Sequence, residues 1–163
     1  MKKIIYALLL TLFLTNNTFA AGSGADGEGS SKVTDYKKAH NLIKSAKKYE
    51  KKGKLEKAKK RYAKAQKLLL KSNEEKPLQA DTLNYLGFTT RKLGDFKKGE
   101  EFYLQGLKIE PNHKGINEYL GELYVVTNRL DLAKERLAVL KTCDCEEYEE
   151  LKAVIDGTKK SKY

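Results

Sequence analysis

The sequence contains few of the residues that interrupt helices. Only two of its 163 residues are proline, Pro77 and Pro111. It also lacks the alternation of apolar and polar residues that is typical of a half-buried strand. From Lys32 onward the apolar residues instead recur at steps of three and four, which is the spacing of one helix face. These features argue against a sheet-based fold and predict an all-α protein.

The chain is poor in residues that build metal and catalytic sites. It has two histidines, His40 and His113, and neither has a second histidine or a cysteine at metal-ligand spacing. No glycine-rich phosphate loop follows a strand, because no strand is predicted. The paired glutamates Glu100-Glu101 and Glu146-Glu147 are typical of solvated helix faces. We therefore expect no catalytic residue, no metal and no cofactor, and a protein that is not an enzyme.

Long apolar runs are also scarce. Ile4–Leu14 is such a run, and it follows two lysines. Thr18 and Ala20 supply the small residues that a signal peptidase prefers at positions −3 and −1. We predict a signal peptide over residues 1–20 and hence an exported protein. The alternative is a retained membrane anchor, although a helix of this length reaches about 16 Å, roughly half of the hydrocarbon core.

A glycine- and serine-rich segment follows the predicted cleavage point. Residues 21–31 read AGSGADGEGSS. Such a composition cannot bury apolar surface, so we predict a flexible leader.

The positive charge of the chain is concentrated in one segment. Residues 32–76 hold 17 Lys and Arg against 5 Asp and Glu, a net charge of +12, whereas residues 77–163 carry a net charge of −1. This asymmetry favours an anionic partner for the first helices. Export argues against nucleic acid, which leaves anionic lipid headgroups, cell-wall polymers or acidic proteins.

Three helical hairpins are predicted from the positions of the turn residues. Gly53, Gly94 and Asn128 each tolerate a positive φ and stand between amphipathic segments. Gly94 and Asn128 are 34 residues apart, and Gly53 and Gly94 are 41 apart. The additional seven residues equal two helical turns, so we predict a longer second helix in the first hairpin, extended over Leu68–Lys76 without rotation of its apolar face.

The repeating unit resembles the tetratricopeptide repeat (TPR) family, whose 34-residue signature is W-x₂-L-G-x₂-Y, then A-x₃-F, then P. The first unit reads Leu42-x₂-Ser45-Ala46-x₂-Tyr49, followed by Ala58-x₃-Tyr62. The second reads Leu83-x₂-Leu86-Gly87-x₂-Thr90, followed by Gly99-x₃-Tyr103 and Pro111. The third reads Asn117-x₂-Leu120-Gly121-x₂-Tyr124, followed by Ala133-x₃-Leu137. The small residues in this pattern are expected to let paired helices approach closely.

The resemblance implies a TPR-type α-solenoid of three helix-turn-helix repeats plus a C-terminal capping helix. The expected domain covers residues 32–157, with repeats at about 39–79, 80–113 and 114–145, a cap helix at 146–157 and a basic, frayed tail at 158–163. Asp144 and Glu147 have the spacing of a capping box at the start of the cap helix.

The two cysteines stand close together at Cys143 and Cys145. In an exported chain such a pair favours a disulfide, which residues two apart can form if the backbone bends. Free or labile thiols, and a redox or metal role for Cys145 near a helix N-terminus, are the alternatives.

The resemblance also implies a concave groove lined by the first helix of each repeat. The positions that it assigns to partner binding are Asn84, Phe88, Arg91, Lys92, Glu118, Glu122 and Val125. Phe88 would anchor an apolar side chain, Asn84 would bond a peptide backbone, and Arg91 with Lys92 would hold a carboxylate. The family's two-carboxylate clamp is not matched.

Together these features predict an exported scaffold that binds a protein or peptide partner through its groove. The charge asymmetry favours an acidic partner. The resemblance to small secreted repeat proteins places it in a bacterial periplasm, with secretion as the alternative. Two other functions stay open from the sequence: peripheral contact with an anionic envelope surface through the basic first helices, and a thiol-redox role at Cys143 and Cys145.

Overall fold

The computed structural model describes residues 33–161, which form seven α-helices and, within this range, no strand. The helices are α1 (Asp35–Lys51), α2 (Leu55–Glu75), α3 (Ala80–Lys92), α4 (Phe96–Ile109), α5 (Lys114–Val126), α6 (Leu130–Leu140) and α7 (Glu146–Ile155). The predicted signal peptide (1–20) and leader (21–31) lie outside the described residues. The all-α fold class is confirmed.

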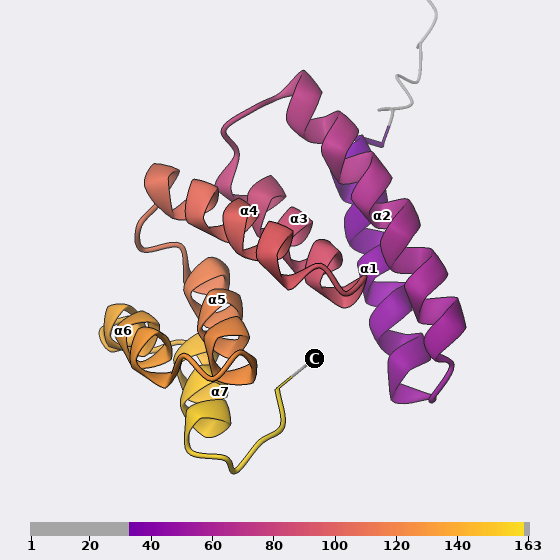
Figure 1. The fold of residues 1–163 in the computed structure, drawn as a ribbon. Coiled ribbons are helices and arrows are strands. Elements are labelled where there is room, and N and C mark those ends of the chain that lie inside the picture. Colours follow the sequence, from indigo (N-terminus) through magenta and orange to yellow (C-terminus); the bar gives the residue numbers. More distant parts are fainter. Residues whose placement is uncertain (1–32, 162–163) are drawn as a thin grey trace, which may run out of the picture. The chain divides into compact units, whose positions relative to one another are not determined.

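The helices pair in chain order into three hairpins. α1 packs against α2, α3 against α4 and α5 against α6, and each hairpin contacts the next through α2 with α3 and α4 with α5 (Figure 1). α7 closes the series by packing against α5 and α6. The predicted architecture of three helix-turn-helix units and a capping helix is therefore observed. Within residues 33–161, no helix combines the length and apolar character needed to cross a membrane.

The three inter-helix turns share one geometry. Gly53, Gly94 and Asn128 have φ values of 67°, 101° and 60°, as predicted for left-handed C-terminal residues. In each turn the next amide donates to a carbonyl five residues earlier, from Lys54 to Tyr49, Asp95 to Thr90 and Arg129 to Tyr124. These bonds satisfy the carbonyls that the helix end leaves unpaired.

The predicted extension of the first hairpin is present in α2. This helix has 21 residues, whereas its counterpart α4 has 14. Leu69 in the extension is fully buried, and Lys71 forms a 2.7 Å ion pair with Asp35 at the start of α1. The two additional turns thus keep the apolar face of α2 directed at the core.

Small residues permit close contacts between helices, as predicted. A Cβ atom on Gly87 of α3 would lie 2.6 Å from Cδ1 of the Tyr103 ring on α4. A Cβ atom on Gly121 of α5 would lie 2.7 Å from Cδ1 of Leu151 on α7. Real Cβ atoms do not approach other carbons this closely, so both glycines are required by the packing.

The predicted capping box of the last helix was wrong, and the first helix begins ahead of the predicted repeat. α1 begins at Asp35, four residues before the predicted repeat, because the Thr34 hydroxyl caps it by accepting from the Lys37 amide at 3.2 Å. α7 begins at Glu146 with Cys145 as its N-cap, and Asp144 is not a cap because its φ is 43°. The Cys143–Cys145 disulfide brings the two Cα atoms to 5.2 Å, which bends the chain at Asp144.

Candidate functional site

The seven predicted groove residues lie on α3 and α5, which contact each other across the second and third hairpins. Five of them are almost fully buried: Asn84, Phe88, Arg91, Glu118 and Glu122. Lys92 and Val125 are half-buried. The hairpins therefore close over most of these side chains, and their predicted role in partner binding stays a prediction.

Phe88 is a core residue and not an exposed anchor. Its ring lies 5.7 Å from the Tyr62 ring of α2 and 5.2 Å from the Tyr119 ring of α5, measured between centroids. The Lys47 ammonium covers it at 4.6 Å from the ring centroid and donates to the Tyr119 hydroxyl at 3.3 Å. Phe88 thus joins the three hairpins.

The predicted basic pair is held by internal contacts. The Arg91 guanidinium donates to the backbone carbonyl of Tyr119, and the Lys92 ammonium lies 2.7 Å from the Glu50 carboxylate. The Tyr62 hydroxyl donates to the same carboxylate at 2.8 Å. Burial, and then this bond to Glu50, raise the pKa of Tyr62, so its hydroxyl stays protonated and remains a donor.

A cavity of about 450 Å³ lies between the N-terminal halves of α3 and α5, and we call it the amide pocket. Its lining residues are Asp81, Asn84, Tyr85, Glu110, Asn112, His113, Lys114, Gly115, Glu118, Tyr119 and Glu147. Asn84 is only 5% exposed, and its side-chain oxygen accepts no hydrogen bond from any residue that the structure describes. The pocket is therefore lined by a residue whose buried acceptor has no donor among the described residues.

The surroundings hold the Asn84 side chain in place. Gly115 lies directly against it, since a Cβ atom there would be 2.8 Å from the Asn84 amide nitrogen. His113 caps α5 through Nδ1, which accepts from the Ile116 amide at 3.2 Å, and its Nε2 lies 3.2 Å from the Asp81 carboxylate. The sequence analysis missed this capping role, which the place of His113 before an apolar helix could have indicated.

A second cavity, which we call the charged cleft, lies between α1 and α7. It is lined by Lys47, Glu50, Lys51, Phe88, Glu146, Glu150 and Lys159. Lys47 at its edge bonds Tyr119 of the amide pocket, so the two cavities are neighbours. The sequence missed the α7 contribution, because this helix lies outside the repeat pattern.

The segment after α7 runs back along the charged cleft. It turns at Gly157, whose φ is 73°, and Lys159 then pairs with Glu150. The Ser161 hydroxyl donates to the buried Glu122 carboxylate at 3.4 Å. Figure 1 shows the chain folding back past α7 in this way. The tail was predicted to be frayed from residue 158, but up to Ser161 it contacts the domain.

The predicted site residues thus do not form a single site. Asn84 and Glu118 line the amide pocket, and Phe88 lies at the base of the charged cleft. Arg91, Lys92, Glu122 and Val125 line neither cavity. Cys143 and Cys145 are joined by a disulfide next to α7.

Comparisons with models of protein families and with curated proteins find no match. Among solved structures the chain is similar to the first TPR domain of Spaghetti (RPAP3) bound to the HSP90 peptide SRMEEVD. The two share 19% identity at a TM-score of 0.49, over 77% of this chain and 95% of that chain. A likeness at this level identifies neither a family nor a partner.

Proposed function

We propose that this protein is an exported, non-enzymatic scaffold that binds an extended segment of a partner protein in the amide pocket. The observation that carries the proposal is the buried Asn84 oxygen, which accepts no hydrogen bond from a described residue. A buried acceptor without a donor costs about 1–3 kcal/mol. A backbone N–H of a bound peptide would remove that cost.

The shape and composition of the pocket fit such a segment. Tyr85 and Tyr119 supply aromatic surface at its sides, while Asn84 supplies the directed acceptor. Both tyrosines have raised pKa values, because burial disfavours their ionised forms. Both tyrosine hydroxyls therefore stay protonated and remain hydrogen-bond donors across the physiological pH range.

The charges at the pocket favour a partner that donates hydrogen bonds. Carboxylates of Asp81, Glu110, Glu118 and Glu147 line it, against the cation of Lys114. An excess of acceptors repels an acidic side chain and attracts N–H groups or a basic side chain. The acidic partner that the sequence favoured is therefore not assigned to this pocket.

Affinity capture from an envelope extract would test the proposal. The bait is residues 21–163, compared with Asn84→Leu, which keeps a similar side-chain volume and removes the acceptor. The matched control is Asn73→Leu, because the Asn73 side-chain oxygen also accepts no bond from a described residue but lies on α2, away from the pocket.

The proposal expects a discrete partner that the wild-type and Asn73→Leu baits retain and the Asn84→Leu bait loses. A peptide from that partner should then bind the purified domain with at least about tenfold lower affinity after Asn84→Leu, the effect of one hydrogen bond. Equal retention of the partner by all three baits would rule out the amide pocket.

A further inference from the structure

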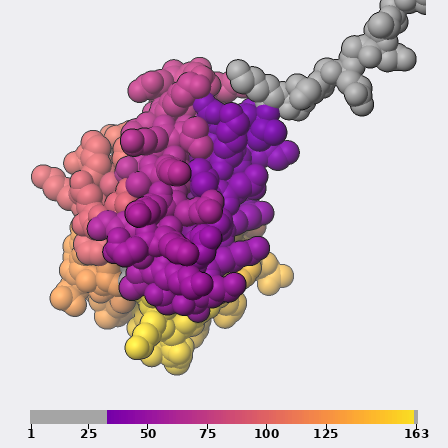
Figure 2. All heavy atoms as spheres, turned by 90° about the vertical axis from the view of Figure 1, so that its right-hand side faces the viewer, coloured from indigo at the N-terminus to yellow at the C-terminus, as the bar shows by residue number. Residues whose placement is uncertain are grey.

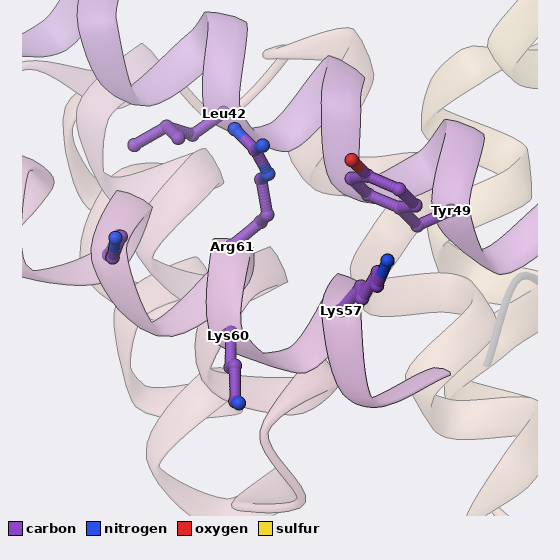
Figure 3. A pocket seen from close by; sticks show the side chains of 6 residues that line it. Leu42, Tyr49, Lys57, Lys60 and Arg61 are labelled. Atoms are coloured by element: carbon purple, nitrogen blue, oxygen red, sulfur yellow. The ribbon is translucent and has the colours of Figure 1, made fainter. Parts of the chain in front are cut away.

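A third cavity lies on the first hairpin, away from the amide pocket. It is a furrow of about 360 Å³ between α1 and α2, lined by Leu42, Tyr49, Lys57, Lys60, Arg61 and Lys64 (Figure 3). We call it the terminal furrow. Only these two helices line it, because the other side of the hairpin packs against α3 and no described helix precedes α1.

The floor of the furrow is apolar. Leu42 and Tyr49 both belong to α1, are half-buried and pack against the core of the first hairpin. They are seven residues apart, which places them about 10 Å apart along the helix. Two apolar side chains separated by two helical turns in a partner would match this spacing.

The wall formed by α2 is cationic. Lys57, Arg61 and Lys64 follow one another at steps of four and three, so they share one face of the helix. Figure 3 shows Arg61 reaching from α2 toward α1 between Leu42 and Tyr49, and its guanidinium carbon lies 5.5 Å from the Tyr49 ring centroid. Lys60 points away from these side chains in the same view.

These cations differ from the paired lysines elsewhere in the domain. Lys71 pairs with Asp35 and Lys98 with Glu101. Within residues 33–161, none of the cations that line the furrow forms an ion pair with a carboxylate. Like charges gathered along an apolar recess repel one another, and an anionic ligand would relieve that repulsion.

We propose that the terminal furrow is a second docking site, which binds an acidic amphipathic segment of a partner protein. Two apolar side chains of the segment contact Leu42 and Tyr49, and its carboxylates pair with Lys57, Arg61 and Lys64. Arg61 binds a carboxylate through two parallel N–H groups, a geometry that its position beside the aromatic floor favours.

The recess favours a protein segment over a membrane surface. Lysine side chains extend beyond the half-buried floor, so a flat bilayer surface would meet the ammonium groups without contacting Leu42 or Tyr49. A protruding leucine or aromatic side chain can reach both the floor and the cations. The furrow and the amide pocket then bind segments of opposite character, which makes the domain a bivalent scaffold.

A synthetic peptide with two leucines seven positions apart among glutamates is the probe. Its affinity for the domain is measured by fluorescence anisotropy, beside a peptide with serine in place of both leucines. The protein variant is Lys57→Glu/Arg61→Glu/Lys64→Glu. Its matched control is Lys97→Glu/Lys108→Glu/Lys134→Glu, which changes three exposed lysines of the other hairpins by the same total charge. Circular dichroism verifies the folding of each variant.

The proposal expects the leucine peptide to bind at least about tenfold more tightly than the serine peptide, as two buried apolar side chains provide. It also expects the furrow variant to lose about tenfold in affinity and the control variant to keep it. Equal affinity of the wild-type protein for the two peptides would overturn the proposal. An equal loss of affinity in the furrow variant and the control variant would also overturn it. Co-sedimentation with phosphatidylglycerol vesicles, without a preference for the leucine peptide, would assign the furrow to a membrane surface instead.

Discussion

Asn84 shows how a single side chain can connect stability with binding. Its side-chain oxygen is buried without a donor from any described residue. Asn84→Leu removes this acceptor at similar volume, so we expect the free energy of unfolding to rise by about 1 kcal/mol. Urea unfolding followed by circular dichroism measures this change. Asn73→Leu is the control, and a large loss of stability in Asn84→Leu would show that the oxygen has a donor in the native protein.

His40 makes the stability of the domain sensitive to acid. Burial lowers its pKa below the ordinary 6.5, the cations of Lys44 and Lys47 lower it further, and Asp81 opposes them. Its ring packs against the Tyr85 ring at 5.2 Å between centroids. Because the unfolded chain binds the proton more readily, the free energy of unfolding should fall as the pH drops below 6.5.

His40→Gln should flatten this dependence, since glutamine does not titrate in the window. Melting temperatures of both proteins between about pH 5 and pH 8 provide the comparison. Parallel curves for wild type and variant would assign the acid sensitivity to another group.

At the scale of elements, the extension of α2 buries one face in the core and leaves the opposite face exposed. Leu69 is fully buried and Leu70 is 41% exposed, although they are neighbours on the same helix. We expect Leu69→Ala to lower the free energy of unfolding by about 2–5 kcal/mol. Leu70→Ala is the matched control and should change it by less than about 0.5 kcal/mol. Similar losses in both variants in urea titrations would mean that the exposed face of α2 is covered in solution.

The hairpins and turns were predictable because they depend on local signals. Gly53, Gly94 and Asn128 mark the left-handed turns, and the seven additional residues before Gly94 predicted the longer α2. The N-cap of α7 is Cys145 and not Asp144, because the backbone at Asp144 follows the Cys143–Cys145 disulfide and not the capping pattern.

The candidate site was predictable only in part. The resemblance to the repeat family assigned Asn84 and Arg91 to the groove but did not show how far the rest of the domain covers them. Arg91 is 2% exposed: it donates to the Tyr119 carbonyl of α5, and Gly99 of α4 leaves room for its side chain, since a Cβ atom there would lie 2.6 Å from Arg91 Cγ. Glu146 and Glu150 reach the charged cleft from α7, a helix for which the repeat pattern has no position.

For the whole molecule, Phe88 is the residue that unites the hairpins. It belongs to α3 and contacts Tyr62 of the first hairpin and Tyr119 of the third. Phe88→Ala should lower the free energy of unfolding by about 3–5 kcal/mol. Because neighbouring repeats stabilise one another through their interfaces, it should also separate the unfolding transitions of the hairpins.

Tyrosine fluorescence and circular dichroism, recorded during the same urea titration, test that separation. The transitions seen by the two probes should coincide in the wild-type protein and diverge in Phe88→Ala. A variant that stays cooperative would show that the interface is held by other contacts.

The path of the C-terminal segment has a practical consequence for the use of this protein as a reagent. Lys159 lines the charged cleft, and the Ser161 hydroxyl donates to the Glu122 carboxylate. An affinity tag or fluorescent protein fused directly after Ser161 would therefore begin next to the surface that capture experiments are meant to probe. Baits and biosensors built from this domain should carry their tags ahead of residue 33.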